Sequence, residues 1–173
     1  MWEGMLFDPH DDRAGFVSSS VFQGSRQMKS RHRAREIALQ TLYAMDFNNE
    51  LGTVPVPEVF PALTEDEQSA LEDEVVLFAK YLVCGTIEHL PEIDAMIGKF
   101  STNRPIDRID VVDRNILRMS IFTLLYAKDI HPHIIIDEAV KLSQDFSSEV
   151  NYKFINGMLD SMRKYLQNEE RVK

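Results

Sequence analysis

The sequence has little of what several kinds of functional site are built from. It contains one cysteine, Cys84, and seven glycines among 173 residues. A lone cysteine forms no internal disulfide, which favours a reducing, cytoplasmic environment, and the apolar run around Cys84 predicts a buried thiol. The few glycines leave little material for phosphate-cradling loops, and the P-loop, GxGxxG and HExxH patterns are absent from the sequence. These absences argue against nucleotide-dependent enzymes and zinc proteases.

Long hydrophobic runs and clustered metal ligands are also missing from the sequence. Its apolar runs fall far short of the ~20 residues that cross a bilayer, and its start lacks the basic and then apolar order of a secretory signal. The five histidines share no i, i+4 spacing, and His131 and His133 flank Pro132 without a neighbouring cysteine or acid cluster. We therefore expect no catalytic residue, no metal site, no cofactor and no membrane association.

Helical spacing dominates from residue 30 onward, whereas strand signals are nearly absent, so the sequence predicts an all-α protein. Helices are expected over residues 30–48, from Thr64 to Phe100 with a break at Pro91, and over 110–127, 134–146 and 148–167. Thr64 and Glu67 have the spacing of a capping box. Residues 1–27 are expected to be a disordered extension, with Met28 as a candidate start. The segment STNRP, residues 101–105, is expected to separate an N-terminal helical subdomain, 28–103, from a C-terminal one, 104–173.

The charge of the chain is unevenly distributed. The formal net charge is −9, yet residues 26–35 hold five cations and no acid: Arg26, Lys29, Arg31, Arg33 and Arg35. Cations at the start of a helix oppose the helix dipole, so stability alone would favour acids there. Arginine forks match phosphate oxygens, and the cluster therefore predicts an anionic polymer as a ligand. A solvated helix start without a ligand is the alternative.

The far side of the first helix carries a second group of apolar residues. The stripe expected in the core includes Ala34, Ile37, Leu42 and Met45. Tyr43 falls almost opposite this stripe, with Leu39 and Phe47 flanking it. This group predicts either a second buried face or a surface for a protein partner, and the spacing does not choose between them.

Three segments resemble one known family. The stretch SRHRAREIALQTLYAMDF at residues 30–47, the pattern DRNILRM from Asp113 to Met119, and AVKLSQDFSSEVNYKFINGMLD at residues 139–160 are similar to those of NusB transcription antitermination factors. The resemblance runs from about Met28 to Leu166. It implies a NusB-like fold of two packed helical subdomains with about six to seven helices, and no catalysis.

The resemblance also implies a function and partners. NusB proteins bind the single-stranded boxA element of ribosomal RNA leader transcripts together with NusE, a small-subunit ribosomal protein. The joint complex reaches the RNA polymerase elongation complex through other Nus factors. It suppresses premature termination and supports ribosomal RNA synthesis. A basic partner would explain why an RNA-binding protein is acidic overall.

Carried over by position, the resemblance assigns residues to two surfaces. The RNA contacts implied are Lys29, Arg31, His32, Arg33, Arg35, Tyr152, Lys153, Phe154 and Asn156. The NusE contacts implied are Tyr43, Asp107, Asp113 and Leu117. Aromatic rings such as Phe154 or Tyr152 suit base stacking, although core packing is an equal alternative for Phe154. Two residues depart from the family pattern. His32 stands at a position that is often arginine, and Val150 stands at a position that is acidic or polar in some relatives.

Two other functions remain open at the level of the sequence. The chain could be a helical module that binds proteins and no RNA. It could also be a stand-alone RNA-binding domain related to the one at the front of certain ribosomal RNA cytosine methyltransferases. RNA affinity at low salt separates the first alternative from the antitermination function.

Overall fold

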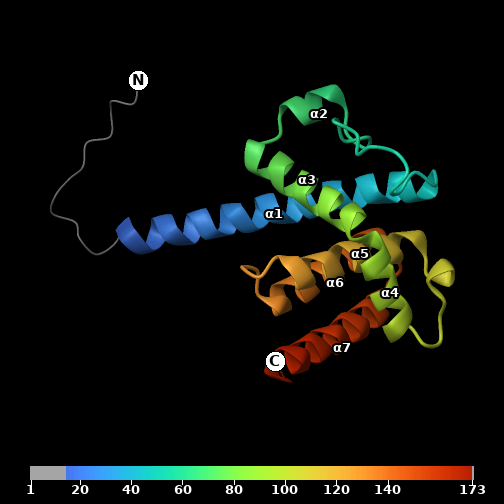
Figure 1. The fold of residues 1–173 in the computed structure, drawn as a ribbon. Coiled ribbons are helices and arrows are strands. Elements are labelled where there is room, and N and C mark those ends of the chain that lie inside the picture. Colours follow the sequence, from blue (N-terminus) through green and yellow to red (C-terminus); the bar gives the residue numbers. More distant parts are fainter. Residues whose placement is uncertain (1–14, 173) are drawn as a thin grey trace.

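The computed structural model describes the backbone of residues 15–172 and the side chains of residues 24–172. This part of the chain is all helical, which confirms the predicted fold class (Figure 1). Seven α-helices and one short 3-10 helix follow one another: α1 (Gly15–Phe47), α2 (Glu65–Ser69), α3 (Asp73–Glu88), α4 (Leu90–Phe100), η1 (Ile106–Arg108), α5 (Val111–Tyr126), α6 (Pro132–Phe146) and α7 (Asn151–Val172).

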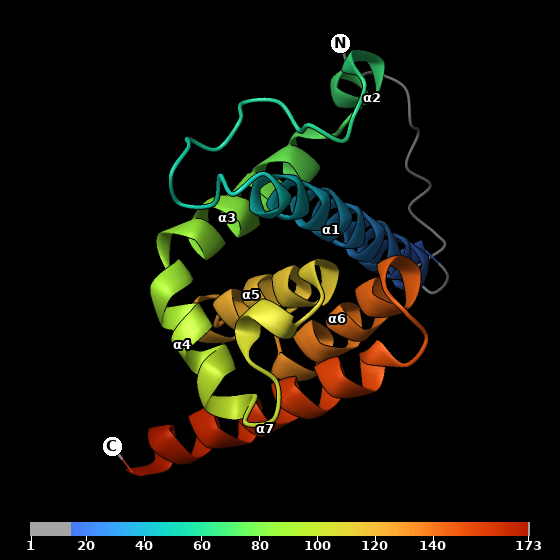
Figure 2. The same cartoon turned by 90° about the vertical axis from the view of Figure 1, so that its right-hand side faces the viewer.

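Helix α5 forms the centre of the bundle. It contacts α1, α3, α4, α6 and α7, which surround it in Figure 2. Its residues from Asn115 to Leu124 are all buried, as expected for a helix that is apolar almost all round. The Asp110 side chain caps its first turn by accepting a hydrogen bond from the Val112 backbone N–H at 2.9 Å.

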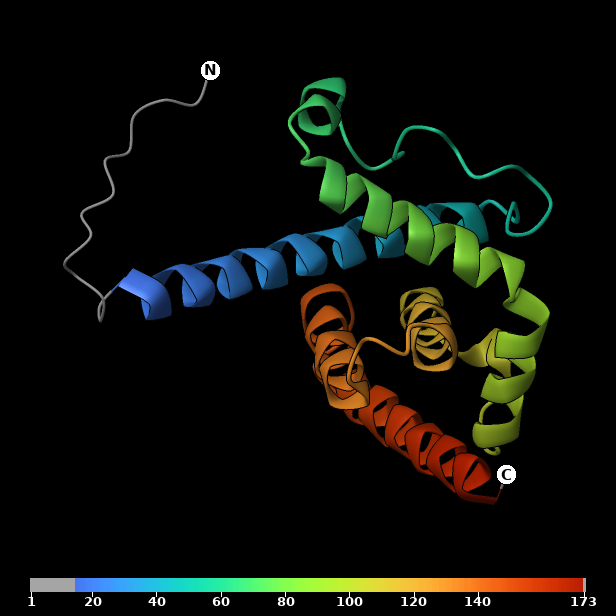
Figure 3. The ribbon, with the colours of Figure 1, turned by 60° about the vertical axis from the view of Figure 1, so that its left-hand side comes forward.

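Helix α1 is longer than the sequence predicts. It begins at Gly15 rather than near Ser30, and its first turns extend beyond the rest of the bundle (Figures 1 and 3). The expectation of an irregular segment before residue 28 is therefore wrong for residues 15–27. Residues 1–14, the remainder of that predicted extension, lie outside the described part. The apolar stripe of α1 is confirmed, since Ala34, Ile37, Leu42 and Met45 are buried.

The helix predicted after Thr64 is divided into three. The capping box is present, with Thr64 Oγ1 accepting from the Glu67 N–H and the Glu67 carboxylate accepting from the Thr64 N–H. However, α2 ends after five residues, and α3 starts only at Asp73. Pro91 lies in the first turn of α4, and His89 ends α3 and begins α4. Proline is tolerated in a first turn because the N–H that it lacks would have no helical partner there.

One hydrophobic core draws on both halves of the chain. It includes Leu39 and Leu42 of α1, Leu82 of α3, Ile116 of α5 and Leu159 of α7. A smaller cluster joins Ala34 and Ile37 of α1 to Phe60 and to α3. The loop at residues 101–105 separates α4 from η1, but the division into subdomains at that point stays a prediction.

Helix α3 approaches α5 closely at a glycine. A Cβ atom on Gly85 would collide with the Phe122 ring, so the absence of a side chain sets the distance between the two helices. The outer stripe of α3 is unusually apolar, with Leu77 69% and Tyr81 43% exposed. Cys84 continues this stripe and is exposed, so the prediction of a buried thiol was wrong. The apolar run around it holds residues of both faces of the helix.

A cluster of charged residues fastens the end of α1 to α5. Asp46 Oδ2 accepts hydrogen bonds from Arg114 Nη2, Asn115 Nδ2 and Arg118 Nη1, each at 2.9 Å. Arg118 also donates two bonds of 2.8 Å to Asp94 of α4. The Arg118 side chain is only 8% exposed, so its charge depends on these two carboxylates for compensation.

We predict that Asp46→Ala strongly destabilises the protein. The change removes the shared acceptor of three donors and leaves part of the Arg118 charge buried without its partner. The free energy of unfolding, measured by urea denaturation, is expected to fall by about 3–5 kcal/mol. Asp137→Ala, which removes an exposed carboxylate of α6, is the control and should change it by less than ~0.5 kcal/mol. Equal stabilities of the two variants would contradict this role of Asp46.

Candidate nucleic-acid interface

The cations at the start of α1 divide between two flanks of the helix. Lys29 is exposed and Arg33 is 42% exposed at its side chain, and both line a cavity of about 550 Å³. His32 and Glu36 of α1 and Glu138 and Lys141 of α6 also line it. Lys29, Arg33 and Lys141 are the cations of this flank, the α1–α6 flank, where Arg33 pairs with Glu36 at 3.0 Å and Lys141 with Glu138 at 2.9 Å.

Acidic residues hold the two helices of this flank together. Glu138 accepts a hydrogen bond from Lys141 Nζ at 2.9 Å and lies 2.7 Å from His32 Nδ1. Burial alone would raise the pKa of Glu138, but these hydrogen bonds and the nearby Arg35 outweigh it and lower the pKa. Asp145 also approaches His32 and Glu36, with ligand atoms of the three residues within 4.8 Å of one another. The spacing of the histidines in the sequence did not reveal this grouping.

The other flank of α1 holds Arg31 and Arg35. Arg31 is partly buried and Arg35 is only 6% exposed, although both were expected at the RNA surface. Both guanidinium groups lie over the Phe78 ring of α3, 5.2 and 5.3 Å from its centre. This side of α1 packs against α3, so Arg35 is buried, and its role as an RNA contact stays a prediction.

The residues predicted near the start of α7 form a mixed surface. Lys153 and Asn156 are exposed, whereas Tyr152 and Phe154 are partly buried. Phe154 packs against the main core on one side, and the Arg104 guanidinium lies 4.9 Å from the centre of its ring. One face of the ring therefore takes part in core packing while the ring also contacts a surface cation, and base stacking by Phe154 stays a prediction.

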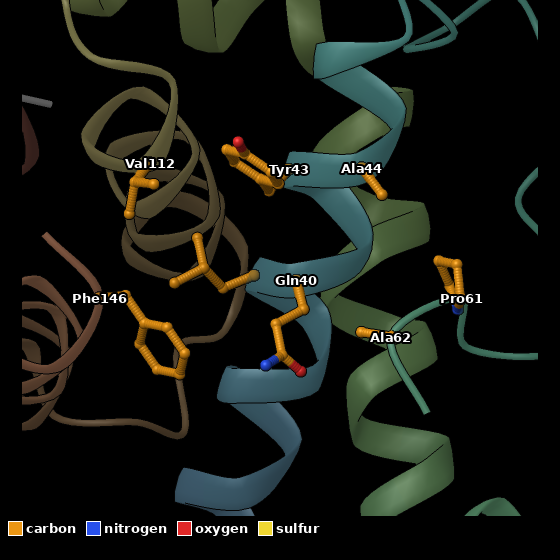
Figure 4. Close-up of a pocket in the computed structure, with 8 residues that line it drawn as sticks. Gln40, Tyr43, Ala44, Pro61, Ala62, Val112 and Phe146 are labelled. Atoms are coloured by element: carbon orange, nitrogen blue, oxygen red, sulfur yellow. The ribbon is translucent and has the colours of Figure 1, made fainter. Parts of the chain in front are cut away.

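Tyr43 lies at the far end of α1 from the basic cluster. It is 39% exposed, and its ring stacks on Phe47 with centres 5.9 Å apart. It borders an apolar cavity of about 310 Å³ whose wall also includes Gln40, Val112 and Phe146 (Figure 4). Leu39, by contrast, is 2% exposed. The far side of α1 thus supplies one buried residue and two exposed aromatics, so it is not a fully buried second face, and a surface for a protein partner stays a prediction.

Of the three other residues predicted to contact a partner, only Asp107 is exposed. Asp113 and Leu117 have no exposed surface, so neither presents a side chain to a partner in this structure. Both are buried positions of α5, and the sequence pattern of a helix that is apolar almost all round does not distinguish an inner face from an outer one.

Asp113 instead connects α5 to the start of α7. Its Oδ2 accepts a hydrogen bond of 2.6 Å from Asn151 Nδ2, and its Oδ1 has no hydrogen-bond partner within the described residues. Burial raises the pKa of the Asp113 carboxyl above its ordinary value, because a buried carboxylate loses its hydration. The charge therefore costs stability at neutral pH, while its hydrogen bond orients the chain just before Tyr152.

None of the helices in the described part of the chain is long and apolar enough to cross a membrane. Its helices present a flank with exposed cations at one end of α1 and exposed aromatics at the other. An all-helical bundle with two such surfaces belongs to the class of helical binding proteins.

The comparisons with known proteins define the family. The model of the NusB family matches residues 32–164. The transcription antitermination protein NusB of Treponema denticola is 40% identical over 133 residues, which cover 77% of this chain and 95% of that protein. The chain therefore belongs to the NusB family.

Solved structures agree with this assignment. A crystal structure of the antitermination factors NusB and NusE in complex with dsRNA matches with a TM-score of 0.69 and 30% identity. The match covers 80% of this chain and 98% of that one. The NusB structure of T. maritima matches with a TM-score of 0.68 and 28% identity, over 78% of this chain and 90% of that one.

We predict that Asp113→Asn stabilises the protein at neutral pH. A folded-state pKa above the ordinary value means that the folded protein favours the protonated acid, so the ionised group reduces stability once the pH exceeds about 4. Asparagine keeps an acceptor for Asn151 without the charge. The melting temperature at pH 7 should rise, and the difference from the native protein should shrink as the pH falls towards 4.

Asp107→Asn is the control for this measurement, because it removes an exposed charge near the start of the same helix. It should leave the melting temperature almost unchanged at both pH values. A lower melting temperature for Asp113→Asn at pH 7 would show that the buried charge stabilises the fold.

Proposed function

We propose that this protein is a cytoplasmic, non-catalytic antitermination factor that binds boxA-type ribosomal RNA together with NusE. The complex would act on the RNA polymerase elongation complex through other Nus factors. The observation that carries the proposal is the arrangement of α1, which has exposed cations at one end and the exposed pair Tyr43 and Phe47 at the other. The names of the relatives support it, since they are antitermination proteins.

The RNA surface would begin on the α1–α6 flank. Lys29, Arg33 and Lys141 offer charged donors to phosphate oxygens, and His32 lies between them. Asp145 of α6 lies beside His32, so α6 connects this flank to the start of α7. There, Lys153 and Asn156 are exposed and Phe154 lies beneath Arg104. Cations that hold phosphates beside an aromatic ring are the usual elements of single-strand recognition.

The two buried residues of the predicted partner surface, Asp113 and Leu117, would act by positioning other residues. The Asp113 carboxylate fixes Asn151 and thereby the first turn of α7. Leu117 packs in the core. Asp113 would thus support the start of α7, and neither residue would touch the partner.

The NusE surface would comprise Tyr43, Phe47 and the cavity that Tyr43 borders. Asp107 would belong to it as well, since it precedes Val112 of the cavity wall by five residues. Exposed aromatics are typical centres of protein interfaces, and acidic residues at the edge would favour a basic ribosomal protein. The solved complex of NusB and NusE supports NusE as the partner, because a NusB protein of similar fold binds it there.

We predict that replacing Lys29 and Arg33 together with glutamine weakens RNA binding. Each lost phosphate contact should reduce the slope of log affinity against log salt by about 0.7 for a single strand, so by about 1.4 for both. Fluorescence anisotropy with labelled boxA RNA at several salt concentrations measures this slope. NusE affinity should stay unchanged.

A matched control replaces two exposed cations away from this flank, Arg108 and Arg171, with glutamine. Scrambled and double-stranded RNA are tested in parallel, since the solved complex contains dsRNA. The proposal fails if NusE together with the protein shows no preference for single-stranded boxA over either RNA. Binding of NusE without any RNA affinity at low salt would favour the protein-binding module instead.

We predict that Tyr43→Ala weakens NusE binding about 10- to 100-fold, the loss of ~1–3 kcal/mol typical of a central interface aromatic. The stacked contact with Phe47 and one wall of the cavity would be lost. Isothermal titration calorimetry with purified NusE measures the change, and Tyr43→Phe is the control because it keeps the ring. An unchanged affinity for Tyr43→Ala would exclude this surface.

A further inference from the structure

Three candidate metal ligands from two helices meet on the α1–α6 flank. His32 and Glu36 lie one turn apart on α1, so both side chains project from the same face of that helix. Asp145 of α6 faces them, and one ligand atom of each residue lies within 4.8 Å of the other two. The sequence does not reveal this group, because its third member follows the others by more than a hundred residues.

The separation of His32 and Glu36 suits a shared cation better than a direct hydrogen bond. His32 Nε2 lies 3.5 Å from Glu36 Oε1. Charge-assisted hydrogen bonds are shorter, at about 2.7–2.9 Å between the heavy atoms. Two ligands in a tetrahedral zinc site, each about 2.0–2.1 Å from the ion, lie about 3.3 Å apart. The observed distance is close to that value.

Neighbouring residues already hold the two α1 side chains in the orientation that metal binding requires. Glu138 Oε2 lies 2.7 Å from His32 Nδ1, so Nδ1 carries the donated hydrogen and the Nε2 lone pair of the neutral ring is left for a ligand. Arg33 Nη1 donates to Glu36 Oε2 at 3.0 Å, which leaves Oε1 for a metal. Outer hydrogen bonds of this kind are the usual support of metal-binding histidines and carboxylates.

Asp145 completes the group without a competing partner. It is exposed, and it makes no hydrogen bond or ion pair within the described residues. Two carboxylates that approach the same imidazole repel each other unless a cation lies between them. Because no described residue holds the Asp145 side chain, its rotation can bring an oxygen to bonding distance of such a cation.

We propose that His32 Nε2, Glu36 Oε1 and one oxygen of Asp145 bind a divalent transition-metal ion, for which Zn²⁺ is the best match. An imidazole ligand favours zinc and similar transition metals over Mg²⁺ and Ca²⁺, which prefer oxygen ligands alone. Three protein ligands leave the fourth position of a tetrahedral site for water. The ion would join α1 to α6 and thereby fix the flank that carries Lys29 and Arg33. The inference does not depend on the proposed function, since it requires no RNA.

The experiment measures the melting temperature of the full chain, freed of metal by dialysis against EDTA, in ZnCl₂ and in MgCl₂ of equal concentration. Zn²⁺ at about ten times its Kd should raise the melting temperature by about 3–5 °C relative to Mg²⁺. Asp145→Asn should weaken Zn²⁺ binding in isothermal titration calorimetry at least ~10-fold, because even the outer residues of a metal site change its affinity by that much. Asp137→Asn is the matched control, since it removes another exposed carboxylate of α6 and should retain the full affinity.

Other histidines of the chain could also bind Zn²⁺, so a second pair of variants tests the position of the site. His32→Gln should abolish the shift in melting temperature, whereas His133→Gln, which removes an exposed histidine of α6, should retain it. Long-range ¹H–¹⁵N spectra of the histidine rings should show that Zn²⁺ displaces the Nε2 signal of His32 and leaves the other rings unchanged.

The inference is overturned if ZnCl₂ and MgCl₂ give the same melting temperature. It is also overturned if Asp145→Asn and Asp137→Asn bind Zn²⁺ equally, or if His32→Gln retains the shift. A protonated His32 ring that pairs with both Glu36 and Glu138 would then account for the geometry.

Discussion

The carboxylate of Asp46 is the interaction on which the position of α1 depends. One oxygen of this side chain accepts from three residues of α5, and Arg118 extends the cluster to Asp94 of α4. Because the apolar stripe of α1 allows some sliding and rotation, directional hydrogen bonds at its last turn are what set its register on the bundle. That register determines which way each candidate contact residue on α1 faces, from Lys29 to Tyr43.

The periodic parts of the fold could be predicted from the sequence because burial leaves a repeating pattern. The stripe Ala34, Ile37, Leu42 and Met45 and the all-round burial of α5 follow from spacing alone. The start of α1 could not be predicted, since residues 15–27 have no sustained apolar period in the sequence. Cys84 shows the same limit, because an apolar run in a helix includes outward-facing positions.

The sequence could predict which residue types form the candidate sites, but not how deeply each side chain is buried. Arg31, Arg33 and Arg35 lie two residues apart in sequence, yet the 100° rotation per residue places Arg33 on a different flank from Arg31 and Arg35. Asp113 and Leu117 match the family pattern but are buried, and a pattern of residue types does not show how deep a side chain lies. The grouping of His32 with Glu138 and Asp145 joins helices that are more than a hundred residues apart, and no local spacing contains that information.

The continuity of α1 sets the distance between the two candidate surfaces. Lys29 and Tyr43 are 14 residues apart on one unbroken helix, which corresponds to about 21 Å at 1.5 Å per residue. Two ligands that bind at a fixed spacing on one helix can raise each other's affinity without a conformational change of the protein. A partner with its own RNA contacts would gain affinity for the strand through a raised local concentration. Cooperativity of this kind would depend on the straightness of α1, so a flexible break between Lys29 and Tyr43 would weaken it while leaving each separate affinity intact.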